Sequence, residues 1–232
     1  MLKLKDCLKA IALCTLFFML LGSSYLSHAQ VASSSLENTL PPAGKMKDDK
    51  PSGKGWVNLL KTADDWNFEN NFWKLENNML TGQMGNEKEH HYSYTKKSYK
   101  DFELNVLIKM TGDENINSGV CVRIKPTNWD NAPGYQVDMG KGYWGSLWEE
   151  RRGNMVQKFP DSLAVKVPRM NDWNHYYIKA VGHHIEAWLN GVKTIDVVHE
   201  AGFTEGQVGF QLCHMHTPTV VEVKSLYLRE IK

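Results

Sequence analysis

Polar side chains in short alternating runs between residues 117 and 152 are the part of this chain best suited to chemistry. Gln136 and Asp138 alternate with apolar residues, and Trp148 and Glu150 are also two positions apart. Successive side chains of a β-strand point to opposite faces, so each pair would share one face of its strand. We interpret this face as a polar binding surface. An ordinary solvated sheet face is the alternative for Gln136 and Asp138.

Arg123 is the first candidate catalytic residue. Strict alternation would place Arg123 on the same face as Cys121 and opposite to Ile124. The planar guanidinium group can hold a hydroxyl, carbonyl or carboxylate group of a ligand. It can equally form a structural ion pair with Asp138 or Glu150 across the sheet, and the sequence leaves both interpretations open.

The remaining polar and aromatic residues of this region suit a sugar. Gln136 can hydrogen-bond to sugar hydroxyls, and Asp138 or Glu150 can act as a base. The flat indole of Trp148 fits the apolar face of a pyranose ring, although core packing is an equally good interpretation. Tyr143 would be a second stacking platform.

Two histidine pairs extend the candidate site. His214 and His216 would point the same way on a strand, where they could hold a divalent metal or transfer a proton. A hydrated strand end near Pro218 is the alternative for His216. In the other pair, His90 and His91, we expect His91 to contact the ligand. No cofactor is expected and no metal site is assigned, but a divalent metal remains an open alternative.

Strand patterns recur throughout residues 55–232, and no segment shows sustained helical periodicity. Asn77-Asn78 and Asn190-Gly191 mark two tight hairpins. Many short strands separated by Gly, Asn, Asp and Pro predict an all-β fold, a two-sheet antiparallel sandwich. Besides the three strands of the polar region, we expect strands over residues 73–76, 79–84, 102–110, 173–181, 185–189, 192–198, 206–213 and 219–229.

The N-terminus predicts an export signal over residues 1–29. Three lysines precede an apolar stretch, residues 10–21, that is too short to cross a bilayer, and Ser27-His28-Ala29 has the small-x-small pattern of a cleavage site. Residues 30–54 are rich in Ser, Pro, Gly, Lys and Asp and predict a flexible linker. Residues 55–232 predict one domain, exported to the periplasm, the cell surface or the medium.

The net charge of the chain limits the classes of partner that are expected. The chain carries a formal net charge of +1, and removal of the signal, which carries +2, leaves −1. Without a basic excess a nucleic-acid partner is not expected, and no later stretch is apolar enough to span a membrane. A neutral sugar or glycoside fits this balance. The two remaining cysteines, Cys121 and Cys213, either form a disulfide or are two small buried side chains.

Standard catalytic motifs are absent from the sequence. It has no nucleophile elbow, no phosphate-binding loop and no metal-binding helix of the His-Glu-x-x-His type. The Glu-x-Asp-x-x-Glu pattern of sandwich-fold glucanases is absent too. The paired-carboxylate mechanism of those enzymes is therefore not expected.

Several short segments in a fixed order carry a resemblance to a known family. They are Tyr94–Leu104, Asn117–Arg123, Gly134–Asp138, Gly145–Trp148, Asp172–Asn174, Leu189–Gly191 and Gly206–Gln211. With them the chain resembles the 3-keto-disaccharide hydrolase domain family. The resemblance implies a concanavalin A-like jelly-roll sandwich that acts on glycosides oxidised at C3. Gln136 stands where the family commonly has Glu, Asp138 where it has Gln, and Trp148 where it has Tyr. The histidine near the end is displaced by one position to His214.

A ketone at C3 acidifies the hydrogen at C2, so that a base can remove it and the C1 substituent can leave by β-elimination. Arg123 would stabilise the enolate oxygen, and Asp138, Glu150 or His214 would supply the base. The expected substrate contacts are Gln136, Tyr143, Trp148, Gln211 and His91. A non-catalytic, lectin-like carbohydrate-binding module is the alternative function, and a structural surface module is a third.

Overall fold

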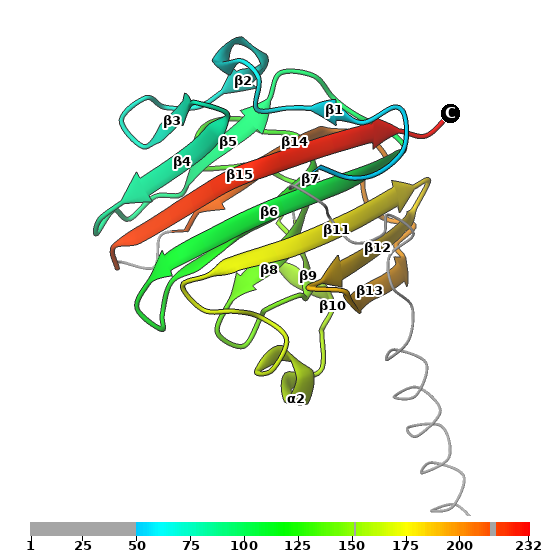
Figure 1. The fold of residues 1–232 in the computed structure, drawn as a ribbon. Coiled ribbons are helices and arrows are strands. Elements are labelled where there is room, and N and C mark those ends of the chain that lie inside the picture. The colour runs from blue at the N-terminus through cyan, green and yellow to red at the C-terminus, as the bar shows by residue number, and fades with distance from the viewer. Residues whose placement is uncertain (1–49, 151, 214–216) are drawn as a thin grey trace, which may run out of the picture. The chain divides into compact units, whose positions relative to one another are not determined.

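A computed structural model describes residues 50–150, 152–213 and 217–232, whose strands form two antiparallel sheets (Figure 1). The first sheet has the order β13–β12–β11–β6–β15–β4–β3, with β1 paired to β15. The second sheet has the order β10–β9–β8–β7–β14–β5–β2. The predicted export signal, most of the predicted linker and His214 lie outside the described residues.

The strands are short and follow one another closely along the chain. Those of the first sheet are β1 (Val57–Asn58), β3 (Trp73–Glu76), β4 (Met79–Met84), β6 (Phe102–Gly112), β11 (Trp173–Val181), β12 (His184–Leu189), β13 (Val192–Val198) and β15 (Thr219–Glu230). Those of the second sheet are β2 (Trp66–Asn67), β5 (His91–Thr95), β7 (Asn117–Ile124), β8 (Tyr135–Gly140), β9 (Leu147–Glu149), β10 (Asn154–Gln157) and β14 (Gln207–Leu212). A 3-10 turn, η1 (Ala63–Asp65), and a single-turn helix, α2 (Asp161–Ala164), complete the fold.

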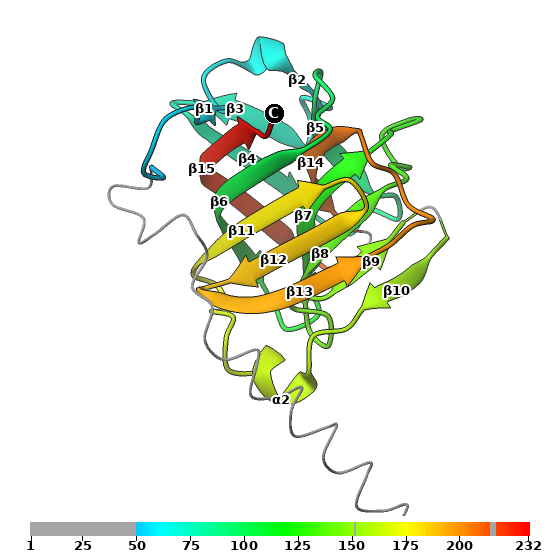
Figure 2. The same cartoon turned by 90° about the vertical axis from the view of Figure 1, so that its right-hand side faces the viewer.

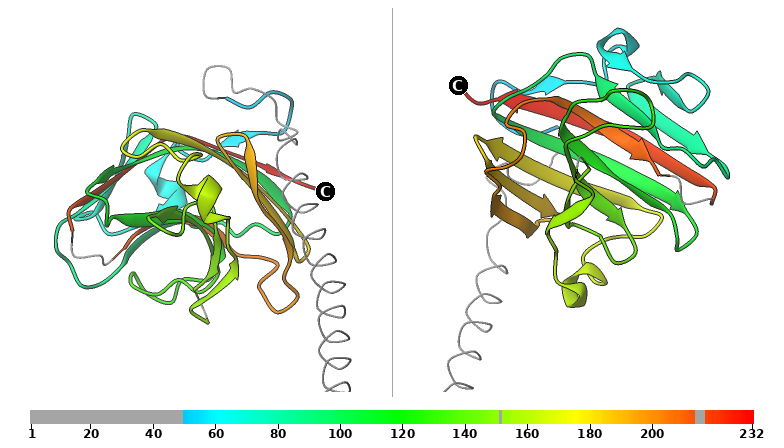
Figure 3. Two further views of the ribbon diagram at one scale, coloured as in Figure 1. Left: turned by 90° about the horizontal axis from the view of Figure 1, so that it is seen from below. Right: turned by 180° about the vertical axis from the view of Figure 1, so that it is seen from behind.

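The hydrophobic core lies between the two sheets, which form two layers, seen obliquely in Figure 2 and edge-on in the left panel of Figure 3. Leu104 and Val106 of β6 meet Val120 of β7 and Val137 of β8 in one buried cluster. Their spacing of two residues puts every second side chain of a strand into this layer. The predicted all-β, two-sheet antiparallel sandwich is confirmed.

Both predicted asparagine hairpins are present, and their turns have the expected backbone. Asn77 and Asn78 have φ values of 51° and 58°, and Asn190 and Gly191 have φ values of 49° and 86°. Positive φ at both central residues is the condition for the tight turn that matches the twist of two antiparallel strands. Strands β3 and β4, and strands β12 and β13, are paired across these turns.

The alternation predicted for β7 is wrong beyond Val122, because the strand contains a bulge. Between the paired positions, β7 advances three residues from Cys121 to Ile124 while β14 advances only two. Arg123 takes the extra place with a φ of 53°. One inserted residue reverses the faces of all residues after it. Ile124 therefore packs on the same face as Cys121, and Arg123 leaves that face.

Candidate functional site

A pocket of about 410 Å³ opens on the second sheet, within the size range of small-molecule sites. It gathers the ends of β7, β8, β9 and β14. Its lining residues are His90, Asn117, Gln136, Asp138, Tyr143, Trp148, Glu150, Gln211 and Cys213. Six of the predicted site residues thus meet in one place: Gln136, Asp138, Tyr143, Trp148, Glu150 and Gln211.

A glycine allows the polar floor of this pocket to form. Gly119 of β7 lies opposite Asp138 of β8, and a Cβ atom there would approach the Cγ atom of Gln136 to 2.3 Å. The Gln136 side chain therefore needs the space over Gly119. In that position its Nε2 donates to Asp138 Oδ1 at 2.8 Å, and its Oε1 accepts from the thiol of Cys121 at 3.3 Å. Both ends of the amide are thus fixed by partners.

Two carboxyl groups share the pocket, and burial shifts both. Burial raises the pKa of Asp138 to about 8; the Gln136 amide opposes this shift and the nearby negative charge of Glu150 adds to it. Burial likewise raises the pKa of Glu150 to about 7. The charged form of a buried carboxyl group loses its hydration, so the neutral form is favoured. The pocket therefore holds two groups that can exchange protons near neutral pH.

Gln211 brings an unsatisfied acceptor to the same pocket. Its side chain is only 2% exposed, and its Nε2 donates to the hydroxyl of Tyr92 at 2.6 Å. Its Oε1 is buried and has no hydrogen-bond partner among the residues that the structure describes. A buried amide oxygen in a lined pocket is a place where a ligand hydroxyl can donate.

Aromatic rings form one wall of the pocket. Tyr143 and Trp148 meet edge to face, with ring centroids 6.4 Å apart and an interplanar angle of 84°. Tyr143 is 45% exposed, so its ring remains open to solvent. A half-exposed tyrosine beside an indole presents apolar surface next to the polar floor, which is the combination that a pyranose ring requires.

A family model described as the 3-keto-alpha-glucoside-1,2-lyase-like domain matches residues 51–229. The chain belongs to this family. The match extends from before β1 to Arg229 in β15, so the pocket lies inside the family domain. A comparison with curated proteins gives no match.

Solved structures with the same fold include both enzymes and binding modules. A protein from Parabacteroides distasonis named as a glycosyl hydrolase is 21% identical, with a TM-score of 0.53 over 76% of this chain and 99% of that one. A carbohydrate-binding module from Bacillus subtilis is 17% identical, with a TM-score of 0.55 over 72% of this chain and 96% of that one. A β-1,3-1,4-glucanase (lichenase) from a mouse hindgut metagenome is 10% identical, with a TM-score of 0.54 over 76% and 98%. At these identities the likeness establishes the fold alone.

Arg123 does not reach the pocket, which corrects the expectation that it shares a surface with Asp138. Its side chain is fully buried, and its guanidinium group donates to the backbone oxygens of Lys100 (2.8 Å), Gly182 (2.6 Å) and Phe203 (3.5 Å). An ion pair to Asp101 at 3.5 Å completes the set. These contacts join three loops at one end of the family domain, and the bulge in β7 is what turns the side chain towards them.

His91 also differs from the prediction. His91, expected at the ligand, is buried, stacks on Phe72 at a centroid distance of 3.5 Å and pairs with Glu69 through Nδ1 at 2.6 Å. Its neighbour His90 lines the pocket instead. Adjacent residues of a strand face opposite ways, so an error of one position exchanges the two. His214 lies outside the described residues.

Three pocket residues were not predicted as site residues: His90, Asn117 and Cys213. Asn117 could have been found, because it stands two positions before Gly119 on the strand that adjoins Asp138. A Cβ atom on Gly140 would approach the Asn117 amide nitrogen to 2.4 Å, so a second glycine makes room for a pocket side chain. Cys121 and Cys213 are both buried and form no disulfide with each other, so of the two interpretations the structure shows the pair of small buried side chains.

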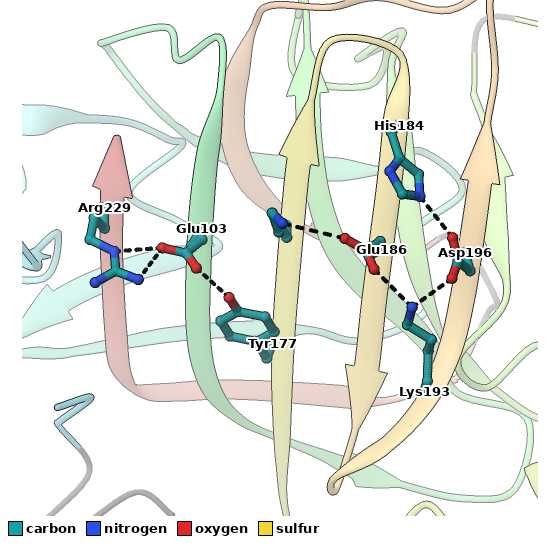
Figure 4. Close-up of polar contacts among 8 residues, drawn as sticks. Glu103, Tyr177, His184, Glu186, Lys193, Asp196 and Arg229 are labelled. Carbon is teal, nitrogen blue, oxygen red and sulfur yellow. Dashed lines mark hydrogen bonds and ion pairs between the residues drawn. The ribbon is translucent and has the colours of Figure 1, made fainter. Parts of the chain in front are cut away.

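A cluster of residues whose side chains can bind a metal ion lies on the first sheet, away from the pocket. Among the described residues, His184, Glu186 and Asp196 of the first sheet place one ligand atom each within 4.8 Å of one another. The ammonium group of Lys193 already bonds to Glu186 at 2.8 Å and to Asp196 at 2.5 Å (Figure 4). A cation of the protein itself thus occupies this cluster.

No helix among the described residues is long and apolar enough to cross a membrane.

Proposed function

We propose that this domain is an exported enzyme that cleaves glycosides carrying a ketone at C3. The observation that carries the proposal is the presence of Asp138 and Glu150 in one pocket, with pKa values raised to about 8 and about 7 by burial. Cleavage by elimination requires one group that accepts a proton and one that donates a proton, both near neutral pH. The family to which the chain belongs supports the 3-keto substrate class.

Glu150 is the proposed base, because its pKa is the lower of the two. Its carboxylate would remove the hydrogen at C2, which the neighbouring ketone acidifies, and the electron pair would form an enolate. Collapse of the enolate would form the C1–C2 double bond and break the bond between C1 and the glycosidic oxygen. The leaving oxygen would take a proton, and later addition of water would complete a hydrolysis.

Asp138 is the proposed acid. A carboxyl group with a pKa of about 8 is protonated at neutral pH and can donate a hydrogen bond or a proton. Because Gln136 occupies Oδ1, the other oxygen of Asp138 is the one that would carry the proton. It would stabilise the developing enolate, the role that the sequence assigned to Arg123, or protonate the leaving oxygen.

Substrate contacts follow from the rest of the lining. Tyr143 and Trp148 would hold the apolar face of the sugar ring, and Gln211 Oε1 would accept from a ring hydroxyl. Asn117 supplies a further amide at the end of β7. The N-terminal signal pattern supports action outside the cytoplasm, which fractionation of cells that express the full chain would test.

Turnover of matched substrates tests the enzyme directly. The parent protein is expected to cleave a 3-keto α-glucoside and to leave the corresponding unoxidised α-glucoside intact. Deuterium at C2 of the keto substrate should slow the reaction, because the proposed step breaks that bond. Cleavage of both substrates at equal rates would overturn the elimination, and inertness towards both would overturn the enzyme.

A carbohydrate-binding module is the second candidate function. The exposed Tyr143 ring beside Trp148 favours it, because such a wall binds a sugar without any reaction. The fold shared with a Bacillus subtilis carbohydrate-binding module is compatible with it. Retention of the parent protein on a sugar column without turnover of the keto substrate would favour this function over the enzyme.

A further inference from the structure

A second pair of aromatic rings lies on the second sheet, on the opposite side of the pocket from Tyr143 and Trp148. Tyr94 belongs to β5, and Trp129 belongs to the loop over residues 125–134 between β7 and β8. Their ring centroids are 5.7 Å apart at an interplanar angle of 36°. Trp129 is 36% exposed. Several large hydrophobic residues of the described chain are exposed, and the aromatic ones among them are Tyr143 and Trp129. They lie on opposite sides of this pocket.

The loop that carries Trp129 is internally bonded. The backbone nitrogen of Thr127 donates to the oxygen of Asn131 at 2.9 Å, and that of Lys125 donates to the oxygen of Pro133 at 2.7 Å. Asn131 also donates from its side chain to the Thr127 hydroxyl at 3.0 Å. A ring held on a bonded loop loses little freedom when a ligand binds to it, so more of the contact energy remains for affinity.

Hydrogen bonds connect this loop to the pocket at two points. The backbone nitrogen of His90, a pocket residue, donates to Asp130 Oδ1 at 2.6 Å. The backbone nitrogen of Tyr92 donates to the oxygen of Trp129 at 3.0 Å, and the Tyr92 hydroxyl accepts from Gln211 of the pocket. Trp129 is therefore fixed at the rim of the pocket, next to the residues that line it.

The distance between the two aromatic pairs indicates the size of the ligand. Strands β9 and β5 are separated by β8, β7 and β14, which is about 19 Å at the usual spacing of neighbouring strands. A single sugar ring against Trp148 cannot reach so far. Two linked rings do not span this distance either, so a ligand that contacts both pairs must contain several rings.

We propose that Trp129, supported by Tyr94, is an outer subsite that binds a distant sugar unit of an oligosaccharide whose first unit occupies the pocket. The proposal rests on the proposed sugar-binding function of the pocket. It makes Trp129 a determinant of ligand length: saccharides with several rings should bind better than one-ring and two-ring glycosides, and the difference should depend on the Trp129 ring.

Calorimetric titration of the Glu150→Gln variant, which should not consume its ligand, tests the subsite. The short probes are methyl α-glucoside and maltose, and the long probe is maltohexaose, each also with C3 of its non-reducing unit oxidised. Adding Trp129→Ala is expected to weaken binding of the long probes by about tenfold, a typical value for the loss of one stacked ring, and to leave the short probes unchanged. Trp129→Phe should restore most of the loss. Trp173→Ala, the same change on the first sheet, should alter neither class of probe.

The outcomes separate the subsite from the pocket. If Trp129→Ala leaves the long probes unchanged, or weakens both classes equally, the outer subsite is wrong while sugar binding by the pocket stands. If no probe of either class binds, the subsite and the sugar-binding function are overturned together. Melting temperatures of all variants, measured in parallel, show whether a loss of binding reflects loss of folded protein.

Discussion

Carboxyl groups on the two sheets have opposite surroundings. On the first sheet, Lys193 donates to both Glu186 and Asp196, and the hydrogen bond from Lys193 is the main cause that holds the pKa of Asp196 below its ordinary value (Figure 4). On the second sheet, Asp138 accepts from an amide, and no cation of the described residues contributes to the pKa shift of Asp138 or Glu150. Burial then raises the pKa values of both.

This difference in surroundings gives the carboxyl group a different role on each sheet. A carboxylate paired with lysine stays ionised across the physiological range and can only stabilise the fold. A buried carboxyl group without a cation changes its protonation state near neutral pH, which costs stability but supports proton transfer. By this criterion the proposed reactive surface is on the second sheet, and the ionic residues in Figure 4 stabilise the fold.

The largest expected effect is on catalysis. Glu150→Gln and Asp138→Asn should each lower kcat/KM for a 3-keto glucoside by about a thousandfold, a typical loss when a general acid or base is removed. Asp196→Asn makes the same chemical change on the first sheet and should leave kcat/KM unchanged. Steady-state kinetics on the three purified variants measure this contrast. Equal losses in all three would remove the distinction between the sheets.

Arg123 offers the next largest effect, on stability. Its fully buried guanidinium group bonds three backbone oxygens, so Arg123→Ala should lower the free energy of unfolding by about 3 kcal/mol or more. Lys74→Ala, which removes an exposed pair with Glu76, should cost less than about 1 kcal/mol. Urea unfolding measures both. If Arg123→Ala instead unfolds like the parent but loses turnover, Arg123 belongs to the site after all.

Most of the pocket residues could be predicted from the sequence, because the alternation of side chains along a strand is enough there to decide which of them share a face. Gln136 and Asp138 are two positions apart on one unbroken strand, β8, and Trp148 lies on β9 with Glu150 one residue beyond the end of that strand. A spacing of two is enough to place such side chains on a common face. The all-β sandwich followed from the same periodicity together with the asparagine turns.

Arg123 and His91 could not be placed in this way, for a common physical reason. The bulge at Arg123 depends on how β7 pairs with β14, where a Cβ atom on Gly206 would approach the Arg123 carbonyl carbon to 2.5 Å. This close contact is between segments some eighty positions apart in the sequence, so no local sequence pattern indicates the bulge. Which of His90 and His91 faces the pocket depends on a single step of register at the start of β5.

Stability against pH tests the electrostatic contrast with opposite signs. The folded-state pKa of Asp138 lies above its ordinary value of 3.8, so the folded protein binds the extra proton and loses stability as the pH rises from about 4 to about 8. Asp138→Asn removes this penalty and should raise the free energy of unfolding by about 2 kcal/mol at pH 8, with little change at pH 4.

Asp196 should behave in the reverse way. Its folded-state pKa is lowered, so its contribution is present above pH 4 and is lost as the pH falls through the folded-state pKa. Asp196→Asn should therefore slightly destabilise the protein at neutral pH and have no effect in acid. Unfolding curves at several pH values compare the two variants. The same sign for both would contradict the assigned surroundings.

The smallest effect, and the most specific, is the shape of the pH–rate profile. Glu150 must be ionised to act as a base, so kcat/KM should rise about tenfold per unit below pH 7. Asp138 must be protonated to act as an acid, so kcat/KM should fall about tenfold per unit above pH 8. The optimum should lie between these values. In Asp138→Asn the alkaline limb should disappear while the acid limb remains, because Asn cannot ionise. A profile that is flat from pH 6 to 9 would exclude both carboxyl groups from the proton transfers, and it would do so even if the protein cleaved its substrate well.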